Sequence, residues 1–297
     1  MIQWIAKHEL CDGDKIDEVK SAKIEYFSAR SFIRYDSVER LDIACKALVW
    51  VFLLDDILEK NPCEEIYKVL FDFIKQLKSG NCANESNKSK SNVAHRFINA
   101  YNEIWQTMCS SSPPEEWKQR LIRGMDIWVR GTQLEHKYRK KGSIISLGEF
   151  LLARWCSGAI FYTLSVMEYT HNQYCCNEAR CDPVFQQIES NFYIVYYALN
   201  DVYSYRKEKI AGDNMNLVMI IINEYGVSSE KAIEIVSQLV NSGIESYECS
   251  LQILDEILPN IDRGTRHYIE SLKYMLRADI DFYFDSSRYV HRKSISL

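Results

Sequence analysis

The sequence predicts an all-α protein, a single-domain helical bundle, and three observations support this prediction. Hydrophobic residues recur at helical spacing through almost the whole chain. The first long apolar face carries Leu41, Ala44, Leu48 and Phe52. Only five prolines and eleven glycines occur, and most of them lie between the helical stretches. Because no shift in composition and no internal repeat divides the chain, we expect one domain, residues 1–297, with a short N-terminal segment before the first helix.

The expected helices follow one another along the chain. After the first apolar face, the helical periodicity covers residues 64–78, 93–108, 115–141, 146–170, 216–226, 229–258 and 266–289. Polar and glycine- or proline-containing stretches predict loops at 79–92, 110–115 and 176–183. The two prolines at 113–114 are typical of the start of a helix. The basic run at 137–141 is interpreted as a solvated helix end.

Composition and charge exclude several classes of protein. The net charge of −5, with both signs scattered, is not typical of a nucleic-acid-binding protein. No run approaches 18 uninterrupted apolar residues, so we expect no membrane span, and the N-terminal residues lack the pattern of a signal peptide. The ten cysteines form no regular framework, which indicates free thiols in a reducing compartment and a cytoplasmic protein. Cys175, Cys176 and Cys181 lie close together, but no histidine or second cysteine pair completes a zinc pattern.

A first group of polar side chains interrupts an apolar, aromatic stretch. Asn200, Ser204 and Glu208 are spaced four residues apart, so their oxygen atoms project from one face of a helix. Asn and Ser are unfavourable inside a helix unless their side chains have a task. An amide carbonyl, a hydroxyl and a carboxylate together form a ligand set that suits a hard cation such as Mg²⁺. An exposed polar stripe is the alternative interpretation.

A second group lies at the end of the first long apolar stretch. Asp55 and Asp56 follow eight apolar residues, and Glu59 lies one turn beyond Asp55 on the same face. Two carboxylates on one face repel each other unless cations lie between them. An ordinary acidic helix end is the alternative, but negative charge is unfavourable at a helix C-terminus.

Together these two groups resemble the metal-binding motifs of class I terpene synthases, most closely the single-domain, microbial-type enzymes. The second motif of that family corresponds to Asn200, Asp201, Ser204 and Glu208, with Lys207 at the basic position before the final Glu. The resemblance covers nearly the whole chain and implies the helical barrel fold of the class I terpenoid synthases.

Two further positions carry this resemblance. The family's diphosphate-sensing arginine is expected 46 residues before the Asn, which is Arg154, and its Arg-Tyr pair is expected about 80 residues after the Glu, which is Arg288–Tyr289. Two features depart from the family pattern. The first motif ends in Glu59 rather than Asp, and the chain begins close to the first helix, so that the N-terminal segment that closes such sites is expected to be short.

The resemblance implies a role for each motif residue. Three Mg²⁺ ions are expected, with Mn²⁺ as a possible substitute. Asp55 would bridge two of the ions, Glu59 would support them, and Asn200, Ser204 and Glu208 would hold the third. The residues expected to bind the diphosphate are Arg154, Lys207, Arg288 and Tyr289. Asp56 and Asp201, which are turned away from the metal face, would accept hydrogen bonds from the arginines.

A carbocation also requires apolar walls and aromatic faces in the interior of the barrel. The residues one or two turns inward from the motifs are Leu48, Val51, Phe52, Tyr193, Tyr196, Tyr197, Ser157, Gly158 and Phe161. The family breaks the helix after the sensing arginine, and Gly158 suits such a break.

The expected function is therefore Mg²⁺-dependent ionisation of a linear prenyl diphosphate, followed by cyclisation and release of diphosphate. Farnesyl diphosphate is the favoured substrate and geranylgeranyl diphosphate follows closely. The protein is expected to act as a monomer or homodimer. The alternatives are a chain-elongating or condensing prenyl transferase, which would need a second aspartate-rich motif, and a non-catalytic helical protein that binds diphosphates.

Overall fold

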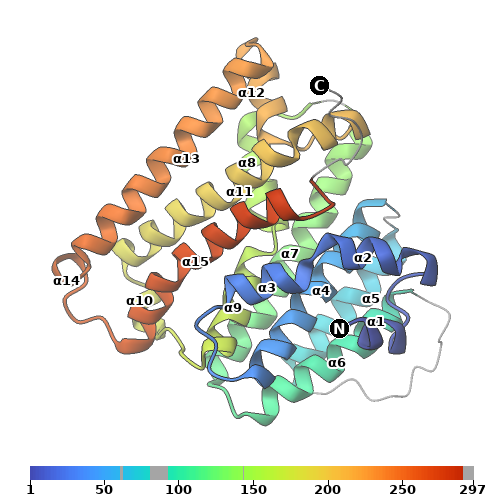
Figure 1. Ribbon diagram of the computed structural model, residues 1–297, viewed down its shortest axis with the longest axis vertical. Coiled ribbons are helices and arrows are strands. Elements are labelled where there is room, and N and C mark those ends of the chain that lie inside the picture. Colours follow the sequence, from blue (N-terminus) through green and yellow to red (C-terminus); the bar gives the residue numbers. More distant parts are fainter. Residues whose placement is uncertain (61–62, 81–92, 143, 290–297) are drawn as a thin grey trace.

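The computed structural model describes residues 1–60, 63–80, 93–142 and 144–289, and all of their regular structure is helical. The helices are α1 (Ile2–Lys7), α2 (Ile16–Ala22), α3 (Ile24–Ser31), α4 (Val38–Lys60), α5 (Glu64–Lys78), α6 (Val93–Ser110), α7 (Glu115–Lys141), α8 (Leu147–Ser157), α9 (Ile160–His171), α10 (Asn177–Arg180), α11 (Pro183–Ala211), α12 (Leu217–Tyr225), α13 (Ser229–Gln252), α14 (Leu254–Ile257) and α15 (Arg263–Asp285), with a 3₁₀ turn at Gly13–Lys15 (Figure 1).

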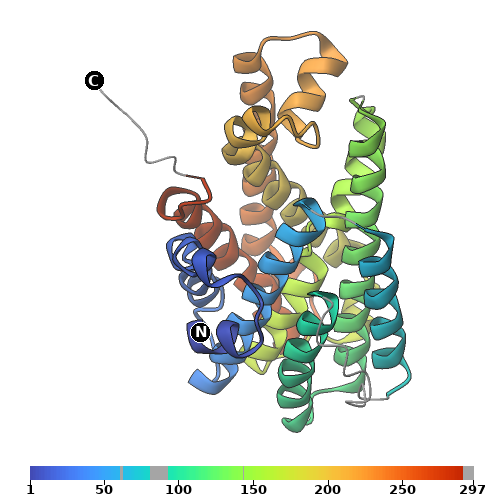
Figure 2. The same ribbon diagram turned by 90° about the vertical axis from the view of Figure 1, so that its right-hand side faces the viewer.

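Helix α4 is packed among several other helices. It contains no glycine or proline, and it packs against α3, α6, α7 and α9. Trp50 on α4 is fully buried, packs against Tyr101 and Trp128, and donates a hydrogen bond from its indole N–H to the carbonyl of Phe97 (2.8 Å). On another side, α11 packs between α13 and α15, and Figure 2 shows the long helices standing side by side. The buried apolar side chains of these helices form one continuous core.

The segment Leu147–His171 is interrupted in its middle. Ser146 starts α8 with a capping box, in which its side chain accepts from the backbone of Glu149. The helix ends at Gly158, and Ala159 adopts a left-handed conformation (φ +55°) before α9 begins. This segment is long and apolar enough to cross a membrane by composition (mean hydropathy 1.4), but 61% of its apolar window is buried in the barrel. The break and the burial identify it as a pair of core helices, and the predicted break at Gly158 is confirmed.

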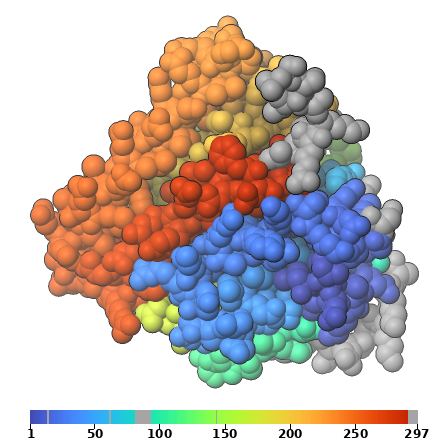
Figure 3. Space-filling view, viewed as in Figure 1, coloured from blue at the N-terminus to red at the C-terminus, as the bar shows by residue number. Residues whose placement is uncertain are grey.

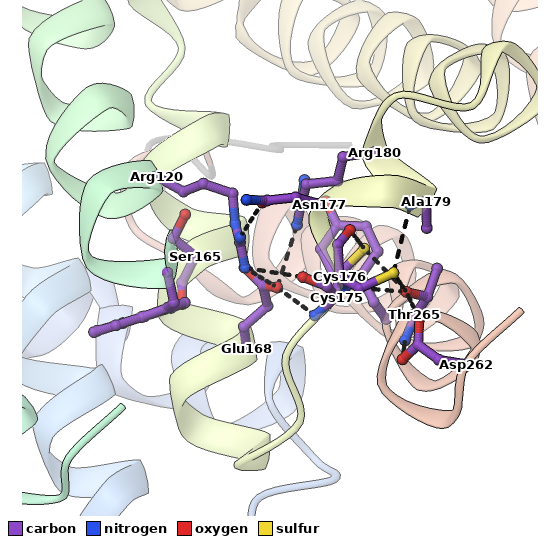
Figure 4. A network of polar contacts seen from close by, with 12 residues as sticks. Arg120, Ser165, Glu168, Cys175, Cys176, Asn177, Ala179, Arg180, Asp262 and Thr265 are labelled. Atoms are coloured by element: carbon purple, nitrogen blue, oxygen red, sulfur yellow. Dashed lines mark hydrogen bonds and ion pairs between the residues drawn. The ribbon is translucent and has the colours of Figure 1, made fainter. Parts of the chain in front are cut away.

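The two ends of the barrel differ in their chemistry. A network of buried charged side chains closes the end where α7, α11 and α15 begin (Figure 4). Glu168 of α9 is buried between Arg120 (2.9 Å) and Arg180 (3.3 Å), and Arg180 also pairs with Glu189 of α11 (3.2 Å). Tyr268 of α15 donates a hydrogen bond to Glu189. At the opposite end α4, α11 and α15 finish close together, because residues near their C-termini contact one another.

Two expectations about the course of the chain are wrong. The opening residues are not a short segment before the first helix, since α1 begins at Ile2 and α2 and α3 follow before α4. Figure 3 shows these N-terminal residues beside α15, where the hydroxyls of Ser21 and Ser287 form a hydrogen bond (2.8 Å). The stretch 176–183 is also not a simple loop, because Cys176 caps the short helix α10 and Asp182 caps α11. Most of the loop predicted at 79–92 lies outside the described residues.

Candidate active site at the C-terminal ends of α4, α11 and α15

The C-terminal segment after α15 joins the two predicted motifs. Arg288 donates two hydrogen bonds to Asp56 of α4 (2.8 and 3.1 Å). The hydroxyl of Tyr289 accepts a hydrogen bond from the side-chain amide of Asn200 on α11 (3.0 Å). The ammonium group of Lys207 lies 5.9 Å from the centre of the Tyr289 ring. The first motif, the second motif and the Arg-Tyr pair therefore meet at one end of the barrel.

Arg154 of α8 is anchored to the second motif. Its Nη2 donates to Asn200 Oδ1 and to Asp201 Oδ1, both at 2.7 Å. Asp201 is buried, and its other oxygen accepts the backbone N–H of Leu217 (2.8 Å). Burial opposes the charge of Arg154, but the negative charges of Asp201, Glu135 and Glu208 together outweigh this effect, so that the pKa of Arg154 is raised. The predicted pairing of Arg154 with Asp201 is therefore present.

Asn216, which the sequence analysis did not select, organises the other two oxygen ligands. Its side-chain N–H₂ donates to Glu208 Oε2 (2.8 Å), to Ser204 Oγ (3.4 Å) and to the carbonyl of Asp201 (2.7 Å). Its carbonyl oxygen accepts the backbone N–H of Val218 and caps α12 (2.9 Å). A buried Asn can hold this position because all its polar atoms are paired.

Four carboxylates gather around the end of α4. Burial raises the pKa of Asp55 well above its usual value, and the nearby charges of Glu59, Glu135 and Asp56 raise it further. Glu135 of α7 is 5% exposed and accepts a hydrogen bond from the hydroxyl of Ser157. Repulsion among these carboxylates is relieved when cations bind between them.

Arg139 lies inside this acidic cluster, so the interpretation of 137–141 as a solvated helix end is wrong for this residue. Its guanidinium pairs with Asp213 (3.1 Å), with Glu135 (3.2 Å) and more distantly with Glu59 (3.9 Å). Its neighbour Lys140 is exposed, as expected for a helix end. One helical turn separates Glu135 from Arg139, so α7 contributes both signs of charge to the site.

A cavity of about 1210 Å³ opens at this end of the molecule. Its polar wall contains Asp56, Glu59, Arg139, Lys207, Glu208, Asp213 and Arg288. Its apolar wall comes from the N-terminal segment and from the outer side of α4, including Val19, Ala22, Leu53 and Ile57. Five of the predicted site residues therefore line this cavity, while Asp55, Arg154, Asn200, Ser204 and Tyr289 lie beside it in the contacts described above.

The predicted apolar lining does not contribute to this cavity and forms two aromatic groups further inside. Phe52 packs against Phe27 and Phe282 and lies 5.3 Å from the guanidinium of Arg288. Phe161 and Tyr193 pack on each other and on Trp155, at ring separations of 4.9–5.9 Å.

The remaining members of the predicted lining surround the break between α8 and α9. Tyr197 lies against Gly158, where an added Cβ would be 2.2 Å from the Tyr197 ring, and its hydroxyl bonds the carbonyl of Trp155 (3.3 Å). Tyr196 packs on Tyr197 with ring centres 5.9 Å apart, and it keeps part of its surface accessible. Leu48 and Val51 are buried core residues.

The donor set fits a hard divalent cation that binds together with an anion. Asp55, Glu59, Asn200, Ser204 and Glu208 supply oxygen atoms only, which is the preference of Mg²⁺. In the described part of the chain no three acidic, histidine or cysteine side chains are grouped so that they could hold a metal ion by themselves. Mg²⁺ usually keeps waters and takes substrate phosphates as ligands in addition to one or two carboxylates, so an incomplete protein cage is appropriate.

Sequence reasoning missed Asn216, Glu135, Arg139 and Asp213. Asn216 precedes an apolar run, which is the pattern of an N-cap, and this signal was available in the sequence. Glu135 and Arg139 have the spacing of an ordinary helical ion pair, which does not distinguish them from surface charges. No local pattern marks Asp213.

Comparison with known proteins places this geometry in a family. A family model described as terpene synthase family 2, C-terminal metal binding, matches residues 46–246. The chain is 25% identical to 10-epi-cubebol synthase of Sorangium cellulosum (strain So ce56), over 97% of this chain and 90% of that protein. It is 22% identical to germacrene A synthase of Nostoc punctiforme, over 100% of this chain and 90% of that protein.

Solved structures show the same fold. Linalool/nerolidol synthase from Streptomyces clavuligerus, in complex with 2-fluorogeranyl diphosphate, superposes with a TM-score of 0.82 at 18% identity and covers 95% of both chains. The structure of a-eudesmol synthase gives the same TM-score at 15% identity, over 96% of this chain and 92% of that one. The match to the family model spans most of the chain, so this protein belongs to terpene synthase family 2, the class I, microbial-type terpene cyclases that act on prenyl diphosphates and release diphosphate.

Proposed function

We propose that this enzyme uses Mg²⁺ to ionise farnesyl diphosphate, or geranylgeranyl diphosphate as the second choice, and that the resulting cation cyclises within the barrel. The observation that carries the proposal is the meeting of both oxygen-rich motifs with Arg154 and Arg288 at one end of the barrel. Each arginine is held in place by a carboxylate, Asp201 or Asp56, before substrate arrives. Donors that are already oriented stabilise a leaving anion without reorganising during the reaction.

Metal binding is assigned to the two motifs. Asp55 and Glu59 would hold Mg²⁺ on the α4 side, and Asn200, Ser204 and Glu208 would hold it on the α11 side. Three ions are proposed, and Mn²⁺ is the expected substitute. When bound, the ions neutralise the charge that develops on the departing diphosphate. Support comes from the raised pKa of Asp55, since crowded carboxylates favour bound cations.

The basic residues would bind the diphosphate oxygens. Arg154, Lys207, Arg288 and the hydroxyl of Tyr289 surround the place where the motifs meet. The Nε of Arg154 is buried and has no hydrogen-bond partner among the described residues, so this donor is available to a ligand. An unpaired buried donor is costly, and a diphosphate oxygen would satisfy it.

The inner aromatic groups would stabilise the carbocation and exclude water. Phe52, Phe161 and Tyr196 retain accessible surface although they lie on inward-facing positions. Aromatic faces attract a cation without attacking it as a nucleophile would. The C15 preference follows relatives such as the T-muurolol synthase of Roseiflexus castenholzii, whose name specifies cyclisation of (2E,6E)-farnesyl diphosphate, at 23% identity over 91% of this chain. We propose that the enzyme acts as a single domain over residues 1–297, as a monomer or homodimer.

The proposal is tested by incubating the pure protein with C10, C15, C20 and C25 diphosphates and by measuring released diphosphate and the hydrocarbon products. Release is expected with Mg²⁺ and is expected to stop on chelation. Asn200→Ala, Ser204→Ala and Glu208→Ala should each lower turnover by at least about a hundredfold while the helical fold remains. Asp55→Asn should be more damaging than Glu59→Gln, because Asp55 would contact the ions directly and Glu59 would only support them.

The alternatives predict different products. A chain-elongating or condensing enzyme would consume isopentenyl diphosphate or join two prenyl chains, and it would yield a longer prenyl product. A non-catalytic diphosphate-binding protein would release no diphosphate from any substrate. If Asn200→Ala, Ser204→Ala and Glu208→Ala all turn over nearly as fast as wild type, these residues are not metal ligands, even if the protein is a cyclase.

A further inference from the structure

One buried carboxylate contacts both halves of the site. Glu135 of α7 is 5% exposed, and its two oxygen atoms have different partners. Oε1 accepts a hydrogen bond from the hydroxyl of Ser157, at the end of α8, and Oε2 pairs with the guanidinium of Arg139 (3.2 Å). Arg139 in turn reaches Asp213 (3.1 Å) and Glu59 (3.9 Å), and these three residues line the cavity. Glu135 therefore joins the wall of the cavity to the break between α8 and α9.

The face of α7 that carries Glu135 lies close to the broken helix. Gly124, Gly131 and Glu135 are spaced seven and four residues apart, so they lie on one face of α7. A Cβ added at Gly131 would collide with the backbone of Ser157. One added at Gly124 would be 2.7 Å from the backbone nitrogen of Tyr162 on α9. The two glycines therefore let α7 touch α8 and α9 directly, and Glu135 continues this face with a charged group.

The last turn of α8 is held from two sides. Arg154 and Ser157 are three residues apart and project from the same side of this turn. Arg154 donates to Asp201 of α11 (2.7 Å), while Ser157 donates to Glu135 of α7. The helix ends at Ser157, and Ala159 has φ +55°, so no continuous helix supports this turn from beyond the break. The two carboxylates therefore determine where Arg154 lies.

The charge of Glu135 also acts on both sides of the site. Burial raises the pKa of Asp55, and nearby charges, including that of Glu135, raise it further. Burial opposes the charge of Arg154, but nearby carboxylates, Glu135 among them, raise its pKa. Once Asp55 and Glu59 are neutralised by cations, they no longer repel Glu135. Arg139, which contacts both Glu59 and Glu135, then pairs more closely with Glu135. Both effects fix the carboxylate of Glu135 and, with it, the end of α8.

We propose that Glu135 is a positioning residue that couples cation binding at the end of α4 to the position of Arg154. On the α4 side it acts through Arg139, and on the α8 side it acts through Ser157. On this assignment Glu135 touches neither the substrate nor an ion. This inference rests on the proposed function, because it requires cations at the carboxylates of α4. The alternative is a set of buried contacts that only stabilises the fold.

The first test is hydrogen exchange of the metal-free protein with and without Mg²⁺ alone, measured by mass spectrometry on peptides 52–60, at the end of α4, and 152–162, across the break. In wild type Mg²⁺ should slow exchange in both peptides, by at least about fivefold at the break. Glu135→Gln keeps an oxygen for Ser157 but loses the charge that attracts Arg139, so only the α4 peptide should respond. Asp126→Asn is the matched control, because Asp126 forms an ion pair at the same spacing on the same helix, with Arg130 (3.0 Å). This control should respond like wild type.

The second test is a double-mutant cycle that asks whether Glu135 acts through Ser157. Glu135→Gln and Ser157→Ala should each lower kcat by at least about tenfold and change the product mixture. The double variant should match the more damaging single variant within about threefold, because both changes interrupt one link. A loss of stability alone would reduce the amount of folded enzyme but would leave the product mixture unchanged.

The outcomes separate this inference from the proposed function. If Mg²⁺ slows exchange at the end of α4 but not at the break of wild type, the coupling is refuted and the metal assignment stands. A wild-type response of the break in Glu135→Gln, or effects on kcat that multiply in the double variant, also overturns the inference. If Glu135→Gln does not fold, Ser157→Ala decides, since a full response of its break to Mg²⁺ overturns the coupling and a lost response supports it. If Mg²⁺ changes neither peptide of wild type, the metal assignment fails and this inference fails with it.

Discussion

Arg288 donates two hydrogen bonds to Asp56, although the two residues lie 232 positions apart in the chain. Burial would raise the pKa of Asp56, but the hydrogen bonds and charge of Arg288 outweigh it and lower the pKa. Asp56 is therefore charged, and the pair fixes the segment after α15 against the end of α4. Because Tyr289 follows Arg288 directly, the same segment places the Tyr289 hydroxyl in contact with Asn200. The site is closed by the C-terminal segment as well as by the helices.

Arg154→Lys is expected to lower turnover by at least about a hundredfold and to weaken binding of inorganic diphosphate with Mg²⁺. The lysine keeps the charge but loses the planar guanidinium, in which Nη2 donates to Asn200 and Asp201 while the buried Nε is left for a diphosphate oxygen. Calorimetry and a turnover assay provide the two measurements. A variant that binds diphosphate and turns over like wild type would place Arg154 outside the site.

Arg139→Gln should lower the free energy of unfolding of the metal-free protein by about 1–3 kcal/mol, because Asp213, Glu135 and Glu59 lose their shared cation. Mg²⁺ alone should raise the thermal midpoint of this variant more than that of wild type, since the ion replaces the missing charge. Lys140→Gln is the control, because this neighbouring side chain is exposed. Equal effects of Mg²⁺ on both proteins would contradict the prediction.

Asn216→Ala should lower the free energy of unfolding by about 1–3 kcal/mol, because a helix cap and buried hydrogen bonds are lost. It should also weaken Mg²⁺-dependent diphosphate binding, since Ser204 and Glu208 lose their common donor. Ser228→Ala removes a comparable cap from α13 at an exposed position. Ser228→Ala should lower the stability of the protein but leave diphosphate binding unchanged. If Ser228→Ala weakens diphosphate binding as much as Asn216→Ala does, the loss of a helix cap explains both effects of Asn216→Ala.

Glu208→Gln tests the electrostatics of the metal-free site. Burial, followed by the charge of Asp201, raises the pKa of Glu208 from 4.5 to about 7. Between pH 4.5 and about pH 7, Glu208 holds a proton in the folded protein that it has released in the unfolded chain. The free energy of unfolding therefore falls as the pH rises through this range. With chelator present, the variant should gain stability relative to wild type as the pH rises from about 4.5 to 7. Thermal unfolding at several pH values measures this, and a constant difference would refute it.

Gly158→Ala should destabilise the protein by about 1–3 kcal/mol and change the product mixture, because the added Cβ would be 2.2 Å from the ring of Tyr197. Gly148→Ala on the same helix is the control, since nothing lies within 4 Å of its added Cβ and alanine favours a helix. Thermal unfolding and product analysis separate the two variants. The prediction fails if they behave alike.

The sequence predicted those features that depend on periodicity and spacing. Apolar residues at helical intervals predicted the long helices. The family resemblance, carried by the spacing of the motifs, implied that Arg154, Asn200 and Arg288 lie at one site; Arg154 bonds Asn200, and Arg288 reaches the same end of the barrel through Asp56. The sequence did not predict Arg139, because an ion pair at helical spacing has the same pattern whether it faces solvent or a cavity. The sequence also did not predict the N-terminal helices. Among them, α3 is packed by contacts with α4 and α15 rather than by a strong pattern of its own.

The buried network of Arg120, Glu168 and Arg180 lies at the end of the barrel opposite the motifs. It joins the starts of α7 and α11 to the end of α9, so one anchor of the fold is located away from the motifs. Under the proposed function, substitutions at Phe52 and Phe161 would alter how the cation rearranges without removing a member of this anchor. A lineage that carries this scaffold can accumulate new products by small steps, and directed evolution should begin with the inner aromatic positions and leave the anchor unchanged.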